Sequence, residues 1–185
     1  MACRGPRIAV LGGMRTETAR QKAGLVDEAM AAEAVRLALP SIETALKRPG
    51  VSGEGVLHLV VTDPLARPGD AAFGEAVLYE HSVGDPATWG ADYRAFAREK
   101  AALAWRSGCD THVLQEARPH LLRPGDTLLW GSVVRDGLVV AASGAHPWFD
   151  EACANIVAGF LLALAQERAR RAREDGLLRL EDDGR

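Results

Sequence analysis

Two apolar runs joined by an aspartate and a glycine constrain the fold of this chain most strongly. The first run covers residues 128–134 and the second covers residues 138–142, with Arg135, Asp136 and Gly137 between them. Aspartate and glycine accept the positive φ angles of a tight turn, so this dipeptide between two β-rich runs is a strong hairpin signal. The sequence therefore predicts a β-hairpin in the second half of the chain.

Three helices are predicted around this hairpin, because apolar residues recur at three- and four-residue steps. They cover residues 26–46, 91–106 and 150–165 or beyond. Pro40 is expected to kink or restart the first helix, and Gly108 to end the second as a C-cap glycine. Asp150 is a suitable N-cap for the third.

Two more strands are predicted upstream of the hairpin. Residues 56–61 form a β-rich run that ends at Thr62-Asp63-Pro64, which is typical of a buried strand. Residues 75–79 form the second run, and the two are compatible with another hairpin. His58 lies inside the first run, where a half-buried core histidine explains it.

The composition fits one folded domain. Apolar residues make up 48% of the 185 residues and charged residues 25%, which is the ordinary globular mixture. A net charge of −3 gives no broad attraction to nucleic acid or to anionic membranes, so we expect neither as a partner. The three cysteines have neither the even number of a disulfide framework nor the spacing of a zinc site. No run approaches the roughly 20 apolar residues of a membrane span, and we expect a cytoplasmic protein.

A nucleotide-binding interpretation of the glycines near the N-terminus is not supported. Gly12 and Gly13 follow a short apolar run, residues 8–11. They lack the third glycine of a dinucleotide fingerprint, and the lysine and hydroxyl residue of a phosphate loop.

Several short motifs in the second half of the chain follow an order found in one protein family. They are Lys100-Ala101, Thr111, the hairpin glycines Gly131 and Gly137, Ser143-Gly144-Ala145 and Asp150-Glu151-Ala152. On these motifs the segment 93–164 resembles the GlcG/HbpS family, also described as DUF336 or the haem-degrading domain, which includes the C-terminal domain of PduO. The first half matches loosely, with Thr62 as an inserted residue and a remodelled segment at residues 64–89.

The resemblance implies a single α/β (α+β) domain in which helices flank a central antiparallel sheet, in profilin-like layers. It implies a domain at residues 26–168, an N-terminal extension at 1–25 and a charged C-terminal tail at 169–185. Members of the family often form symmetric oligomers, and haem or corrinoid binding has been assigned to some of them. We therefore expect a homo-oligomer that binds a small-molecule ligand, with haem as a candidate cofactor.

In this fold, the end of the first strand, the central helix and the loop after the hairpin would bound a pocket. The expected catalytic residues are Lys100, His146 and Asp63. A lysine near buried surface can have a lowered pKa, and a loop histidine can act as a ligand or a base. The expected ligand-binding residues are Thr111, His112, Ser143, Gly144, Ala145, Trp148 and Asp150. The Ser143-Gly144 backbone next to a helix N-terminus could donate N–H groups to an anion, whereas a tight turn without a ligand explains it equally well.

These residues lead to three functional hypotheses. The first is a small-molecule or tetrapyrrole (haem-like) binding protein, in which His146 ligates the metal and Trp148 walls a flat ligand. The second is a cofactor-free enzyme that uses Lys100 or His146 as acid or base on a small anionic metabolite. The third is an assembly subunit without a ligand.

Overall fold

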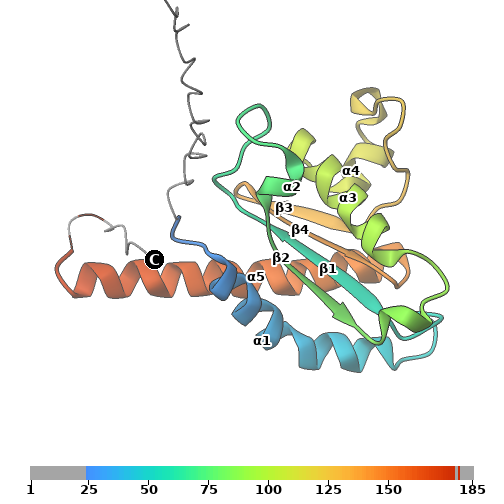
Figure 1. The fold of residues 1–185 in the computed structure, drawn as a ribbon, viewed down its shortest axis with the longest axis horizontal. Helices are drawn as coiled ribbons and strands as arrows, with labels where there is room; N and C mark the ends of the chain where they lie inside the picture. The colour runs from blue at the N-terminus through green and yellow to red at the C-terminus, as the bar shows by residue number, and fades with distance from the viewer. Residues whose placement is uncertain (1–23, 178, 180–185) are drawn as a thin grey trace, which may run out of the picture.

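The computed structural model describes residues 24–177 and 179 as a four-stranded sheet with helices on both faces (Figure 1). The strands are β1 (Leu57–Thr62), β2 (Val77–Val83), β3 (Ser132–Arg135) and β4 (Leu138–Ser143). The helices are α1 (Glu28–Leu46), α2 (Phe73–Ala76), α3 (Tyr93–Ser107), α4 (Thr111–Glu116) and α5 (Pro147–Glu174), with 3-10 turns η1 (Pro86–Thr88) and η2 (Pro119–Leu121).

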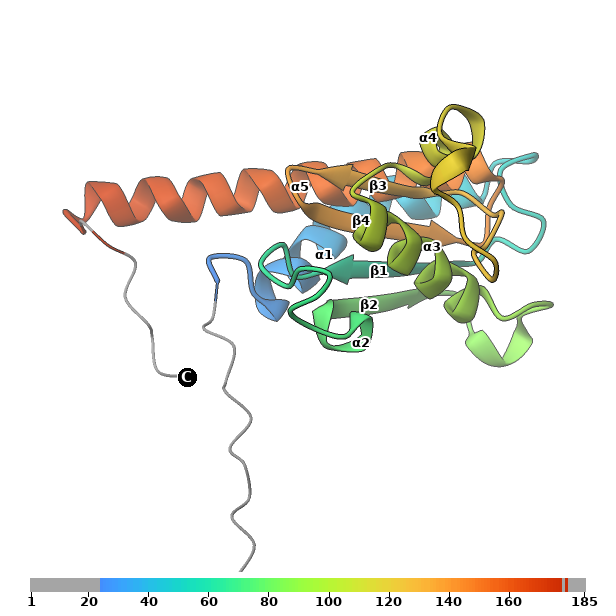
Figure 2. The same cartoon turned by 90° about the horizontal axis from the view of Figure 1, so that it is seen from above.

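The sheet has the order β2-β1-β4-β3, and all neighbouring strands are antiparallel. Helices α1 and α5 cover one face and α3 covers the other, as Figures 1 and 2 show from two directions. This arrangement confirms the α+β class with a central antiparallel sheet and flanking helices. The expected N-terminal extension falls largely outside the described residues.

Both faces of the central strands are buried, and alternate residues of a strand pack against the helices on opposite faces of the sheet. Leu57, Leu59 and Val61 of β1 pack in the larger core with α1 and α5. Val60, between them, packs against Ala97 and Ala101 of α3 in a smaller core on the opposite face. Small alanines at this contact let α3 approach the sheet closely. This double coverage explains why β1 has the continuous apolar run that predicted a buried strand.

The hairpin prediction is confirmed at its turn. Asp136 and Gly137 both have positive φ, 52° and 88°, as a two-residue turn of the I′ type requires. The first strand of the hairpin, β3, starts later than the apolar run suggested, at Ser132. The N–H groups of Gly131 and Ser132 donate to the Thr111 hydroxyl. Leu128 and Leu129 lie before the strand and are exposed.

The third helix begins earlier than predicted, and the first is not restarted. Helix α5 starts at Pro147 with His146 as its N-cap, so the assignment of Asp150 as N-cap is wrong. Proline fits the first helical position because its fixed φ is helical and it has no N–H to leave unpaired. Helix α1 runs through Pro40 as one element. Helix α5 also continues to Glu174, so the expected domain end at residue 168 falls inside a helix.

Helix α5 is unusually long and carries an exposed apolar stripe. Its C-terminal half projects beyond the sheet (Figures 1 and 2). By length and composition it is the one described helix that could cross a membrane. A third of its most apolar 18-residue stretch is buried inside the domain. Core helices of soluble proteins pass the same test, so this is weak evidence for a membrane. Trp148, Ile156 and Phe160 are exposed on its outer side.

Gly144 occupies a position where the fold admits no side chain. Its φ is 139°, and a Cβ atom there would lie 2.8 Å from the Cα of Leu57 and closer still to the carbonyl oxygen of Val56. The β4–α5 connection therefore crosses directly over the start of β1.

We expect Gly144→Ala to lower the free energy of unfolding by at least about 2 kcal/mol, through backbone strain and overlap with β1. The matched control is Gly159→Ala, on the open side of α5, where a Cβ meets nothing within 4 Å. That change should instead stabilise the helix by about 0.5–1 kcal/mol. Urea denaturation followed by circular dichroism measures both; equal effects of the two substitutions would contradict the close contact.

Candidate functional site

Lys100 lies under the sheet–helix junction rather than in an open pocket. Its side chain is 3% exposed, and its ammonium group donates to three oxygens. These are the Ala142 carbonyl oxygen at 3.0 Å, the Ser143 hydroxyl at 3.2 Å and Oδ2 of Asp150 at 2.8 Å. An ammonium group has three N–H donors, so all of them are used. The structure therefore brings together three predicted site residues, but as a buried hydrogen-bond network.

The carboxylate of Asp150 fills the position expected for an external anion. Its Oδ1 accepts the N–H of Ala145 at 2.9 Å, and the Gly144 backbone also hydrogen-bonds to the carboxylate. Of the Ser143-Gly144 backbone that the sequence suggested for a ligand, Gly144 is therefore bonded within the chain, together with Ala145. The negative group belongs to the first turn of α5, where the helix dipole favours it. The backbone N–H groups of the Gly144-Ala145 turn therefore have their hydrogen-bond acceptor within the chain.

Thr111 joins the same buried network. Its hydroxyl accepts the N–H groups of Gly131 and Ser132 at 3.0 and 3.1 Å. The Ser132 hydroxyl lies 3.0 Å from the Thr111 hydroxyl and donates to the Lys100 carbonyl oxygen at 3.1 Å. Thr111 therefore fixes the chain entering β3, and it is fully buried.

Burial shifts the pKa values of this pair in opposite directions. It raises the pKa of Asp150 to about 6, although Lys100 and the backbone N–H groups act to lower it. It lowers the pKa of Lys100, against the effect of the Asp150 carboxylate. Perturbed pKa values often mark active sites, but structural ion pairs produce them as well. Because both side chains are almost completely buried, a structural role explains these shifts.

Asp63 lies at a different place on the sheet. In the β1–β4 register, His58 is opposite Ser143 and Val61 is opposite Val140. Asp63 is five positions beyond His58, about 16 Å along the strand. Its Oδ1 accepts the Leu65 N–H at 2.8 Å in a local turn. The structure thus does not bring Asp63 together with Lys100.

His146 and Trp148 lie at the surface where α5 begins. Their rings stack with centroids 5.0 Å apart and planes at 11°, and Trp148 is 56% exposed. The predicted flat-ligand wall is therefore accessible, but it is separate from Lys100.

His112 is the remaining predicted site residue and is half-buried on α4. Its Nδ1 lies 2.6 Å from Oε2 of Glu151, and its ring lies 5.8 Å from that of Trp130. His112 and Glu151 come from helices α4 and α5, which brings an imidazole and a carboxylate together at the β3 edge of the domain.

An apolar groove that the sequence did not indicate runs between α1 and β2. It has a volume of about 470 Å³ and is lined by Ala29, Ala32, Glu33, Val35, Arg36, Leu39, Tyr79 and His81. Residues 79 and 81 face the same way because side chains alternate along a strand. The Tyr79 hydroxyl lies 3.5 Å from Nδ1 of His81, and their rings are stacked. Burial lowers the pKa of His81, with Glu43 acting in the opposite direction.

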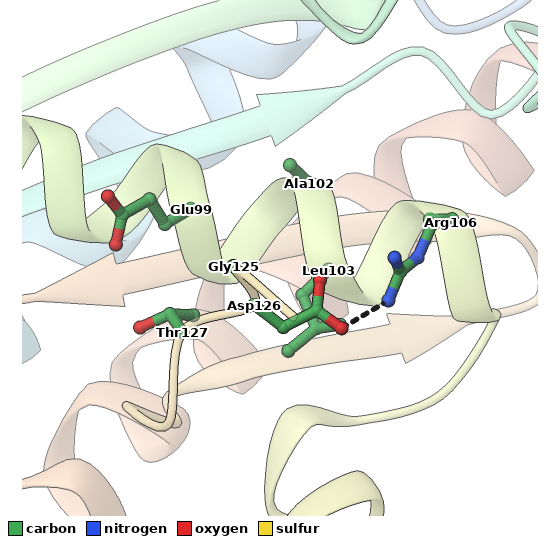
Figure 3. Close-up of a pocket in the computed structure, with 7 residues that line it drawn as sticks. All are labelled: Glu99, Ala102, Leu103, Arg106, Gly125, Asp126 and Thr127. Atoms are coloured by element: carbon green, nitrogen blue, oxygen red, sulfur yellow. Dashed lines mark hydrogen bonds and ion pairs between the residues drawn. The ribbon is translucent and has the colours of Figure 1, made fainter. Parts of the chain in front are cut away.

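A smaller cleft lies on the other side of the sheet, between α3 and the segment 125–127 (Figure 3). Its volume is about 200 Å³. Arg106 and Asp126 form an ion pair at 2.7 Å across it, and this hydrogen bond lowers the pKa of Asp126 (Figure 3). The cleft has less than half the volume of the groove, which makes it the weaker ligand site of the two.

Comparisons with protein families, with characterised proteins and with solved structures find no match to this chain. The fold and the groove define a single-domain α+β protein with a candidate small-molecule site. The resemblance to the GlcG/HbpS family stays a prediction.

Replacing Lys100 by methionine tests the structural role of the buried pair. We expect Lys100→Met to destabilise the protein by about 3–5 kcal/mol at pH 8, because it leaves the Asp150 carboxylate buried without its cation. The double variant Lys100→Met/Asp150→Asn should recover much of this loss, since the amide oxygen can still accept the Ala145 N–H.

The loss should also depend on pH. The pKa of Asp150 in the folded protein, about 6, lies above its ordinary value of 3.8, so the folded state takes up a proton that the unfolded state has released. The contribution of Asp150 to the free energy of unfolding falls as the pH rises from 3.8 to about 6. Removing the Lys100 cation raises the pKa of Asp150 in the folded protein further, so this fall extends to higher pH. Lys100→Met should therefore be more stable at pH 5 than at pH 8, relative to the wild type, in urea denaturation. A loss independent of pH would contradict this role.

Proposed function

We propose that this protein binds a small molecule in the groove between α1 and β2, and that a planar metal-bearing tetrapyrrole such as haem suits the groove best. The observation that carries the proposal is the imidazole of His81 on the wall of an apolar groove of about 470 Å³. Ligand sites in proteins commonly have volumes of about 300–1,000 Å³ and a mainly apolar lining with few polar groups.

The state of the imidazole supports metal ligation. Burial lowers the pKa of His81, which favours the neutral ring at neutral pH, and only a neutral imidazole has a lone pair for a metal. Nδ1 lies 3.5 Å from the Tyr79 hydroxyl, so Nε2 is the nitrogen that would hold a metal. Ala29, Val35 and Leu39 line the groove with apolar groups, which suits the apolar ring of a macrocycle.

Arg36 gives the groove a cation for an acidic ligand group. It forms an exposed ion pair with Glu33 one helical turn away. Exposed pairs of this kind contribute about 0–1 kcal/mol, so a ligand carboxylate can replace Glu33 at little cost. Haem carries two carboxylates next to an apolar ring, which matches an arginine at the rim of an apolar groove.

The two hypotheses built on Lys100 and His146 have less support from the geometry. Lys100 has no contact with solvent that a substrate could use, and its three donors are taken. His146 is accessible, but its stacking partner Trp148 stands on an exposed helix end rather than in an apolar groove. A ligand-binding role at His81 is therefore preferred over a cofactor-free enzyme.

Titration with haem tests this proposal. The wild type should shift the Soret band and saturate at one equivalent. His81→Ala should weaken haem binding by more than about tenfold. Losing a group that only supports a metal ligand already has an effect of that size, and His81 is proposed as the ligand itself. The matched control is His120→Ala, which removes an exposed histidine from η2. Leu39→Arg should also weaken binding, because it places a charge in the apolar wall.

Circular dichroism of each variant establishes that the fold is retained. His146→Ala and His112→Ala distinguish the groove from the histidines at the α5 end. Absence of saturable binding, or a loss in His146→Ala with none in His81→Ala, would contradict the proposed groove.

A further inference from the structure

A second group of metal-binding side chains lies away from the groove, near the β3 edge of the sheet. Asp110 precedes α4, His112 lies on α4 and Glu151 lies on α5, 39 residues from His112. Strands β2 and β3 form opposite edges of the sheet, so this cluster and the groove are separate sites. We propose that Asp110, His112 and Glu151 bind one divalent transition-metal ion of the zinc or cobalt type.

The donor atoms lie close enough for one ion. One ligand atom from each of the three residues lies within 4.8 Å of the other two, and Nδ1 of His112 is 2.6 Å from Oε2 of Glu151. Ligands about 2.0–2.2 Å from a metal are themselves about 3–4 Å apart, so an ion entering here would displace the proton between His112 and Glu151 and move their side chains slightly apart. All three residues are half-buried, which leaves them accessible to an ion from solvent.

The mixed donor set selects the kind of metal. Imidazole nitrogen suits zinc, cobalt and other transition metals, whereas magnesium and calcium prefer oxygen ligands alone. The two carboxylates and the nearby Arg135 together carry one net negative charge, which favours a cation. Three protein ligands also leave one position of a tetrahedral zinc site open to water or a small ligand.

The cluster rests on a rigid support. The Val134 N–H donates to Oδ1 of Asp110 at 2.6 Å, and Arg135 donates to both oxygens at 3.0 and 2.9 Å. Arg135 is itself held by Oδ1 of Asn155 at 2.6 Å. Such groups orient metal ligands, and their loss typically weakens metal binding by about 10–100-fold.

The buried network also fixes the backbone beneath the cluster. Thr111 lies between Asp110 and His112 in the chain, and its hydroxyl is anchored to the start of β3. Asp150, which is bonded to Lys100, immediately precedes Glu151. Each accessible metal ligand is therefore next to a buried residue that holds its backbone in place, which reduces the entropy lost when an ion binds.

Cobalt and zinc titrations of the full chain test this site. In excess Mg²⁺, the wild type should bind one equivalent of Co²⁺, with visible d–d absorption, and one equivalent of Zn²⁺ by calorimetry. Glu151→Gln and His112→Ala should each weaken binding by at least about tenfold. Glu151→Gln keeps the side-chain shape, so it serves if His112→Ala folds poorly.

Two controls are available on the same segment. Glu116→Gln removes an exposed carboxylate from α4, and His120→Ala removes an exposed histidine from η2. Both should bind metal as the wild type does. The proposal is overturned if the wild type does not bind near one equivalent, or if Glu151→Gln and His112→Ala bind as the controls do. The result is separate from the groove, because neither substitution touches a residue that lines it.

Discussion

The buried ion pair between Lys100 and Asp150 connects the three elements on which the domain depends. Lys100 comes from α3 on one face of the sheet, Asp150 from α5 on the other, and the ammonium group also binds the end of β4. Such a pair is weak evidence for stability, because desolvation opposes the attraction. Its effect here is positional: α3, β4 and the first turn of α5 have one mutual arrangement in which all these donors and acceptors are satisfied.

Features of the fold set by local chemistry were predictable from the sequence. The turn at Asp136 and Gly137 needs only two residues that accept positive φ, and Gly108 ends α3 for the same reason. The role of Asp150 was missed because it depends on Lys100, which is 50 residues away in the chain. An aspartate before a helical pattern resembles an N-cap, but Pro147 had already begun the helix. Tertiary contacts thus overrode a local signal.

The candidate site was likewise predictable only in part. The motifs placed Lys100, Thr111, Ser143 and Asp150 near one another, and the structure does join them, yet burial turns the expected pocket into a structural network. The groove was missed because the predicted strand ended at Tyr79, which left His81 in a loop, whereas β2 continues to Val83. Since Tyr79 and His81 are two residues apart, extending that strand would have placed both side chains on one face.

The layered architecture explains why both proposed sites lie at sheet edges. Helices cover both faces of β1 and β4, so the central strands offer no free surface for a ligand. Every residue of β2, by contrast, is half-buried, and its side chains divide between two layers. Glu80 and Ser82 contact His58, while Tyr79 and His81 line the groove against α1.

At the opposite edge, β3 is short, and its end supports Asp110 through Val134 and Arg135. Polar side chains at the two edges also discourage pairing with another sheet. His81 on β2, and Asp110, His112 and Glu151 beside β3, are half-buried, so the two edges present the accessible histidines and carboxylates with which ligand binding is possible.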